Sequence, residues 1–256
     1  MPARRTFRLI AVLALLLPAL AVPATSIANA PDSRGHVRAL FFGDSLMKGV
    51  GVHPVRPVMA RLVARRLGWD VTVDAVPGTG YTTGGARSRP YLERLKEKGV
   101  LSTPYDVVVV EGGTNDKAAS PATMRERTTD AIRYVRSRLP NAWIVLMGAY
   151  NPSGRWYDAR RVTIDAVIQA VAVEQSLPFF SPISGQWTKG QGRRFLCPDG
   201  LHPSAFGYGV MAARMTAALR QAHAGGVCTP GPTAPCATRA GGLPARSARP
   251  AHAGVS

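Results

Sequence analysis

The sequence is poor in acidic residues, lysine and cysteine, and it contains no long apolar run. Only 15 residues are acidic against 32 lysines and arginines, which gives a formal net charge of +17 over 256 residues. No stretch reaches the roughly 18 apolar residues of a membrane helix, so an integral membrane protein is not expected. Three cysteines are too few for a disulfide-stapled miniprotein or a zinc-ribbon array.

Several functional motifs are also missing. There is no phosphate loop, no His-Glu-x-x-His and no paired Cys-x-x-Cys, so neither a metal nor another cofactor is expected. The glycine-rich run at 78–84 resembles a dinucleotide loop, but its third glycine comes one residue late. No basic stripe is interleaved with aromatic residues, so nucleic-acid binding is not expected. A hydrophobic content of 46% instead predicts an ordinary globular chain.

The N-terminus carries the features of an export signal. Three arginines at positions 4, 5 and 8 precede an apolar segment at 9–22, and Ala28-Asn29-Ala30 forms a small-x-small cleavage site. We therefore interpret residues 1–30 as a signal peptide and expect a secreted or cell-envelope protein. The pair Arg4-Arg5 also resembles a twin-arginine export signal.

The C-terminal stretch at 224–256 has no acidic or aromatic residue and is rich in Ala, Gly and Pro, which predicts a disordered tail. The remaining body, residues 31–223, contains 26 basic and 15 acidic side chains. An exported protein with this charge is expected to associate with anionic cell-wall polymers or lipid headgroups. In an oxidising compartment we expect the cysteines to form one disulfide. The sequence leaves two pairings as alternatives, Cys228–Cys236 and Cys197–Cys228.

The body alternates between strand and helix patterns, which predicts a three-layer α/β/α fold with about five parallel strands. The strands are expected at 37–42, 71–75, 107–111, 143–147 and 178–180. The helices are expected at 55–67, 90–98, 121–139, 156–175 and 204–222, and Ser120 followed by Pro121 is a good helix start. Ligands bind at the carboxyl ends of strands in such sheets, so the loops after the strands are the places to search for chemistry.

Two of these loops offer a nucleophile and a base. Ser45 lies in Gly43-Asp44-Ser45-Leu46, where the first strand turns toward a helix. The motif Gly-x-Ser-x-Gly is absent, which argues against an ordinary α/β-hydrolase. Asp199 precedes His202 by three residues in a turn constrained by Gly and Pro, so its carboxylate can orient the imidazole as a base. His53 is the other candidate for this base.

Two further loops offer hydrogen-bond donors. Asn115 follows the third strand in Gly112-Gly113-Thr114-Asn115-Asp116 and can direct a side-chain N–H group into the same region. Gly78 follows the second strand in Pro77-Gly78-Thr79-Gly80-Tyr81, where a backbone N–H can face a developing oxyanion. Taken singly, each of these loops is explained equally well as a structural turn.

Together, the four loops resemble the sequence blocks of the SGNH (GDSL-type) hydrolases, in order and in approximate spacing, over residues 37–222. The four namesake residues have counterparts in Ser45, Gly78, Asn115 and His202. The resemblance implies a flavodoxin-like sandwich and a serine esterase. Ser45 would be the nucleophile and His202 the general base, oriented by Asp199. The N–H groups of Ser45 and Gly78 and the Asn115 side chain would hold the oxyanion, with Gly80 as an alternative to Gly78.

The sequence therefore predicts an exported carboxylic-ester hydrolase, expected to be a monomer. Few large apolar residues follow Ser45, which favours short acyl groups such as acetyl esters on a glycan. Lipase, lysophospholipase or thioesterase activity, acyl transfer through the same acyl-enzyme, and a non-catalytic wall-binding protein stay as alternatives. The pairs Arg193-Arg194 and Arg160-Arg161 are candidates for contacting an anionic substrate, although solvated surface explains them more simply. Trp156-Tyr157 and Trp187 are candidates for a substrate site, although core packing is the simpler account.

Overall fold

The computed structural model of the chain describes residues 36–52, 58–87, 89–152 and 157–224. The predicted signal segment and the tail beyond residue 224 lie outside these ranges. Three further predictions also concern residues outside these ranges. They are those for His53, for Trp156 and for a disulfide involving Cys228 or Cys236.

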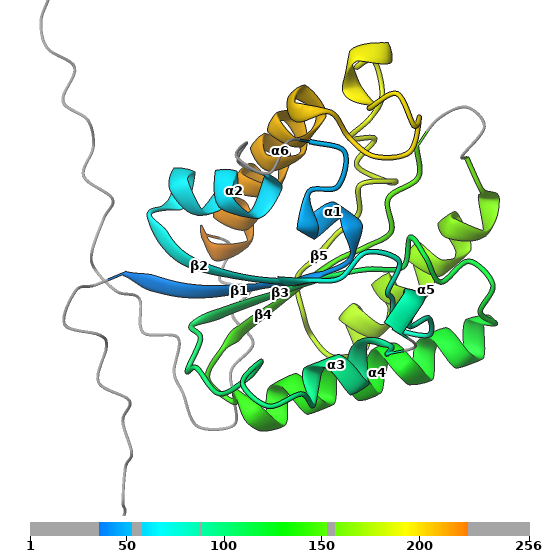
Figure 1. Cartoon of the computed structure of the whole chain (residues 1–256). Coiled ribbons are helices and arrows are strands. Elements are labelled where there is room, and N and C mark those ends of the chain that lie inside the picture. The colour runs from blue at the N-terminus through cyan, green and yellow to red at the C-terminus, as the bar shows by residue number, and fades with distance from the viewer. Residues whose placement is uncertain (1–35, 53–57, 88, 153–156, 225–256) are drawn as a thin grey trace, which may run out of the picture. The chain divides into compact units, whose positions relative to one another are not determined.

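The described residues form a five-stranded parallel sheet in the order β2-β1-β3-β4-β5 (Figure 1). The strands are β1 (Val37–Gly43), β2 (Trp69–Ala75), β3 (Val107–Glu111), β4 (Trp143–Met147) and β5 (Phe179–Phe180). All five predicted strands are thus confirmed, and so is the α/β fold class. Every residue of the central strand β3 is buried, because helices cover both faces of the sheet, and this explains why its run of valines shows no polar alternation.

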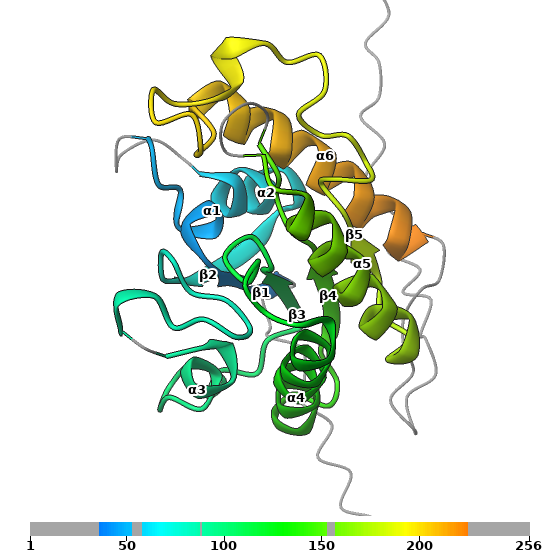
Figure 2. The same ribbon diagram turned by 90° about the vertical axis from the view of Figure 1, so that its right-hand side faces the viewer.

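Helices cover the two faces of the sheet in separate groups (Figures 1 and 2). Helices α1 (Ser45–Lys48), α2 (Met59–Leu67) and α6 (Ala205–Ala224) pack on one face, where Val107 and Val109 point. Helices α3 (Tyr91–Leu95), α4 (Pro121–Arg138) and α5 (Ala159–Glu174) pack on the other, where Val108 and Val110 point. Each long helix falls within about four residues of its predicted range. The four-residue helix α1 was not predicted.

Local signals explain several helix ends. The Ser120 hydroxyl accepts a hydrogen bond from the N–H of Thr123 at 3.1 Å, and Pro121 occupies the first turn of α4, which confirms the predicted start. The carboxylate of Asp158 caps α5 in the same way, through the N–H of Arg160. Helix α3 is shorter than the predicted 90–98, because tight turns with i→i+3 bonds replace it from Glu97 onward.

The strand order determines where a site can form. The chain passes from β1 to β2 on one side of it and then crosses to β3 on the other side. This makes the carboxyl edge of β1 and β3 the topological switch point of the sheet, where ligands bind in open α/β folds. Among the described residues, no helix is long and apolar enough to cross a membrane.

Candidate active site

Ser45 lies at the switch point, on the turn between β1 and α1. It is the first residue of α1 and only 9% exposed. Asp44 caps the helix, because its Oδ1 accepts a hydrogen bond from the N–H of Leu46 at 2.9 Å. Gly49 ends α1 with a left-handed φ of 80°, a conformation that glycine adopts without steric cost. The turn therefore holds Ser45 at a defined place on the sheet edge.

Asn115 connects the loops after β1, β2 and β3. Its Nδ2 donates to Oδ2 of Asp44 at 2.8 Å and to the carbonyl oxygen of Thr79 at 2.9 Å. Three of the four loops singled out in the sequence thus meet through one side chain. Both hydrogens of the Asn115 amide are engaged in these bonds, so an incoming oxyanion must share or replace one of them.

The two candidate glycines of the β2 loop differ in their surroundings. The N–H of Gly80 donates to the carbonyl oxygen of Thr83 at 2.7 Å. A side chain at Gly80 would collide with the buried carboxylate of Asp116, which itself accepts bonds from the N–H groups of Tyr81 and Thr82. Gly78 has a left-handed φ of 75°, and its N–H meets no acceptor among the described residues. Gly80 therefore has a structural task that Gly78 does not share.

Asp199 and His202 form a hydrogen-bonded pair. Oδ2 of Asp199 lies 2.7 Å from Nδ1 of His202, and Oδ1 accepts the N–H groups of Leu201 and His202 at 2.8 and 3.0 Å. Burial would raise the pKa of Asp199, but the bonds from His202 and Leu201 outweigh it, and the pKa lies below its ordinary value. The carboxylate is therefore held ionised, and Nε2 of His202 stays available for chemistry.

The His202 turn packs against the segment that follows Ser45. A Cβ atom placed on Gly51 would lie 3.1 Å from Cβ of His202, and the N–H of Val50 donates to the carbonyl oxygen of Ser45 at 3.0 Å. Sγ of Cys197 lies 2.9 Å from the carbonyl oxygen of Gly51. Burial raises the pKa of Asp44, and the charge of His202 is the smallest of the influences that act on this carboxyl. The fourth loop thus joins the other three at one edge of the sheet.

A pair of buried carboxyl groups underlies this edge. Asp44 and Glu111 are both fully buried, and the N–H of Asp44 donates to Oε2 of Glu111 at 3.1 Å. Burial raises the pKa of Asp44 to about 6. Burial, followed by the charge of Asp44, raises the pKa of Glu111 well above its usual range. We conclude that Asp44 ionises at a lower pH than Glu111. Sequence reasoning assigned Glu111 no role, although an acid at the end of a buried valine strand is a recognisable signal.

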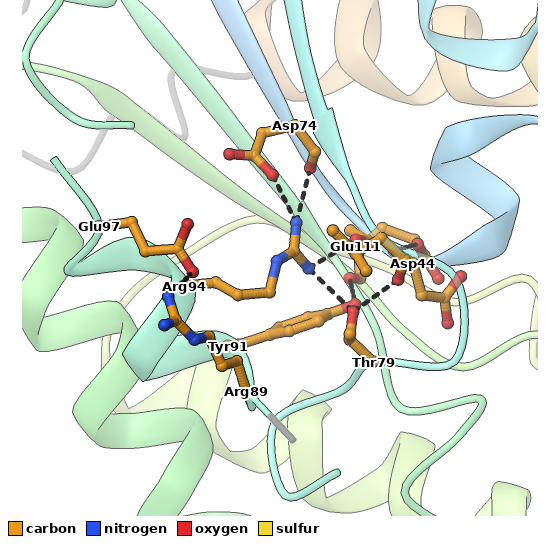
Figure 3. A network of polar contacts seen from close by, with 10 residues as sticks. Asp44, Asp74, Thr79, Arg89, Tyr91, Arg94, Glu97 and Glu111 are labelled. Carbon is orange, nitrogen blue, oxygen red and sulfur yellow. Dashed lines mark hydrogen bonds and ion pairs between the residues drawn. The ribbon is translucent and has the colours of Figure 1, made fainter. Parts of the chain in front are cut away.

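Arg94 was also missed, and it ties three strand-end segments together (Figure 3). Its Nη1 donates to the carbonyl oxygen of Gly43 at 3.0 Å and to Oγ1 of Thr79 at 2.9 Å. Its Nη2 donates to the Asp74 carboxylate at 2.5 Å, and the guanidinium carbon lies 4.3 Å from the centre of the Phe42 ring. The side chain is only 4% exposed. Arg94 therefore braces the loops of Ser45 and Gly78 from beneath.

Of the other residues singled out in the sequence, Trp187 and Arg161 are buried and Arg160 lies on the surface. Trp187 is buried in the core, as the simpler account predicted, and Arg161 is buried with its Nε donating to the Thr114 carbonyl oxygen. Arg160 pairs with Asp158 on the surface. Cys197, the one cysteine among the described residues, forms no disulfide with any of them.

Comparisons with known proteins identify the family and similar folds. A family model described as the GDSL-like Lipase/Acylhydrolase family matches residues 41–210. A lipase/acylhydrolase from Enterococcus faecalis is similar at 23% identity and a TM-score of 0.59, covering 72% of this chain and 96% of that one.

Two carbohydrate esterases share the fold as well. A family two carbohydrate esterase from Clostridium thermocellum is 22% identical with a TM-score of 0.54, covering 72% of this chain and 63% of that one. A carbohydrate esterase family 2 enzyme with a carbohydrate binding domain, from Corynascus thermopiles, is 21% identical with a TM-score of 0.57, covering 75% and 68%. No curated protein matches the chain.

Proposed function

This chain belongs to the GDSL-like lipase/acylhydrolase family and is an ester hydrolase, and we propose that it cleaves carboxylic esters through Ser45, His202 and Asp199. The main support is the meeting of four strand-end loops at the switch point of the sheet. One loop carries a hydroxyl on a capped turn, and another carries an imidazole whose Nδ1 is bonded to a carboxylate. The SGNH resemblance of the sequence agrees with the family and with the observed fold.

In the proposed mechanism, Ser45 Oγ attacks the acyl carbonyl carbon while its proton passes to Nε2 of His202. The bond between the carbonyl carbon and the alcohol oxygen then breaks, and His202 returns the proton to the leaving alcohol. Water attacks the acyl-enzyme with the same base and releases the acid. Asp199 holds the ring orientation and stabilises the imidazolium formed in each half-reaction.

The oxyanion of each tetrahedral intermediate needs donors at the same edge. We assign this role to the N–H groups of Ser45 and Gly78 and to the Asn115 side chain. Among the described residues no acceptor bonds to either N–H group, whereas the N–H of Gly80 is already used by Thr83. This difference supports Gly78 over Gly80. The bonds from Asn115 to Asp44 and Thr79 keep its amide oriented before substrate binds.

A short acyl group on a carbohydrate is the substrate class that we propose. Leu46 and Met47, the apolar residues directly after Ser45, are buried in the core, so they do not line a channel for a long chain. Two proteins of the same fold are carbohydrate esterases. Activity on lipid esters is the alternative that the experiment below distinguishes. Thioester hydrolysis and transfer of the acyl group to a sugar hydroxyl stay as further alternatives, and competition by an added sugar acceptor separates the transfer reaction.

Hydrolysis of p-nitrophenyl esters from acetate to palmitate tests both the mechanism and the acyl length. We expect turnover that falls with chain length and is lost in Ser45→Ala, because that change removes the nucleophile. His202→Ala should be nearly as damaging, whereas His53→Ala should change little. Circular dichroism of each variant controls for folding. Undiminished turnover in a folded Ser45→Ala variant would reject the mechanism, and a peak at long chains would move the substrate to lipid.

We also propose that the enzyme works outside the cell, on or near anionic polymers. The predicted export signal and the positive charge support this second part of the proposal. The excess of 26 basic over 15 acidic side chains in residues 31–223 supports electrostatic association. Cosedimentation with isolated cell walls should fall steeply between low salt and about 0.5 M salt, because exposed charges are screened. Recovery of the mature protein only from the cytoplasm, or wall binding that ignores salt, would contradict it.

A further inference from the structure

A cavity of about 440 Å³ lies beside the proposed catalytic turn. Its walls come from the segments that follow β4 and β5, and they include Tyr150, Lys189, Arg193 and Leu196. The strands are parallel, so these segments leave the sheet at the same edge as the Ser45 loop. No catalytic role has been given to any of the residues that line it.

Two contacts join this cavity to the Asp199–His202 turn. Leu196, in the wall, pairs with Pro203 in an antiparallel bridge, and the N–H of Cys197 donates to the carbonyl oxygen of His202 at 2.8 Å. Tyr150 is close enough to Asp199 that this charge contributes, after burial, to raising the pKa of the phenol. A group bound in the cavity would therefore lie next to the proposed base.

The cavity is cationic and its cations are uncompensated. None of the residues that line it is acidic. Among the described residues, no carboxylate lies within ion-pair distance of Lys189 or Arg193, whereas Lys117 and Arg125 are paired with acids. Arg194, next in the chain, stacks instead on the Phe206 ring at 3.7 Å.

Tyr150 adds an unpaired polar group beside the cavity. It is 1% exposed, and its hydroxyl has no hydrogen-bond partner among the described residues. Buried hydroxyl groups usually have a partner. Two exposed cations without a carboxylate partner, on one hollow whose wall has no acid, match the charge of a carboxylate or phosphate group.

We propose that this cavity binds an anionic oxygen group, a carboxylate or a phosphate, on the alcohol part of the ester substrate. The proposal rests on the esterase function above and narrows it to esters of acidic carbohydrates. The exposed Tyr157 belongs to a neighbouring hollow that shares Lys189 with this cavity, and its ring offers a face for the rest of such a sugar.

Binding is tested first, without turnover. The Ser45→Ala protein is titrated calorimetrically with glucuronate, glycerol 1-phosphate, and the neutral controls glucose and glycerol. We expect saturable binding of at least one anion, and binding about tenfold weaker when Lys189→Gln and Arg193→Gln are added, because charge-assisted bonds are lost. The matched control adds Lys98→Gln and Arg133→Gln, which remove two exposed charges from the α3 and α4 region and should leave binding unchanged. Absence of anion binding, or equal losses in both double variants, would overturn the proposal.

A matched set of acetate esters then tests the consequence for catalysis. We expect kcat/KM for 3-acetoxybenzoate or 3-acetoxyphenyl phosphate to exceed that for methyl 3-acetoxybenzoate by about tenfold. This preference for the anionic esters should disappear in the Lys189→Gln/Arg193→Gln enzyme because their KM rises. Comparing the two anionic esters shows whether the site favours a carboxylate or a phosphate. Ser45-dependent turnover with no preference for charge would overturn this inference alone. Anion binding without hydrolysis of any ester would instead reject the esterase function and support the cavity assignment.

Discussion

The carboxylate of Asp44 connects the proposed nucleophile to two other parts of the site. One oxygen caps the helix that begins at Ser45, and the other accepts the Asn115 amide. The backbone of Asp44 in turn donates to the buried Glu111. The pKa of both buried carboxyl groups is raised, because two adjacent buried charges would be costly. At the scale of residues, the acid next to the serine thus organises the donors around it.

Asn115 provides a test at this scale. If its amide stabilises the oxyanion, Asn115→Ala should lower kcat by roughly 100- to 1,000-fold with little change in KM, the range typical of a lost oxyanion donor. Asn141→Ala, on an exposed turn before β4, is the matched control and should retain full activity. A folded Asn115→Ala enzyme with kcat within a few-fold of the wild type would assign Asn115 to structure alone.

Residues in short strand-end motifs were the ones that sequence reasoning identified. Asp199 and His202 are three residues apart and their contact is local, so it could be predicted without a fold. The partners of Asn115 lie 36 and 71 residues away, and no local pattern specifies such distances. Our preference for Gly78 over Gly80 rests in the same way on the folded structure, in which the N–H of Gly80 donates to the carbonyl oxygen of Thr83.

At the scale of elements, Arg94 holds strands β1 and β2 in relation to the loop of Thr79. The guanidinium spans four acceptor atoms, a geometry that the single ammonium group of lysine cannot reproduce. A short helix, α3, therefore determines how two strand ends meet beneath the site.

We expect Arg94→Lys to lower the free energy of unfolding by about 2–4 kcal/mol, because buried acceptors lose their donors. Arg89→Lys is the control on the same segment, since Arg89 pairs with Glu97 at 2.9 Å with its side chain 60% exposed, and it should cost less than about 1 kcal/mol. Urea unfolding followed by fluorescence gives both values. Equal effects of the two substitutions would show that Arg94 does not brace the strand ends.

The strands and long helices were predictable because their signals are local. The unbroken valines of β3 and the Ser120-Pro121 start of α4 specify their own elements through burial on both faces and through capping. Helix α1 was missed because four residues are too few for a periodic pattern. It exists because Asp44 and Gly49 close its two ends.

At the scale of the whole molecule, burial of carboxyl groups makes stability depend on pH. Asp165 is 5% exposed, and its Oδ2 accepts a bond from the Ser181 hydroxyl. Burial raises the pKa of Asp165 from 3.8 to about 6. The folded protein therefore holds this proton more tightly than the unfolded chain, so the contribution of Asp165 to stability falls as pH rises through this interval.

Comparison of wild type with Asp165→Asn isolates this effect. The amide does not titrate, so the unfolding free energy of the wild type should fall relative to the variant by about 2 kcal/mol between pH 4 and pH 7. Urea unfolding at several pH values measures the difference, and other titrating groups cancel. A difference that stays constant over this range would show that Asp165 titrates alike in the folded and unfolded protein.

The sequence by itself determined the α/β class, the five strands and the motifs at their ends, because burial patterns, caps and short turns act between neighbours in the chain. Only the tertiary structure decided the strand order, the bracing by Arg94, the Asp44–Glu111 pair and the cationic cavity. The contacts of Arg94, Asp44 and Glu111 depend on the burial of charges among residues far apart in the chain. The cost of burying a charge, and the partners that offset it, exist only once the chain has folded.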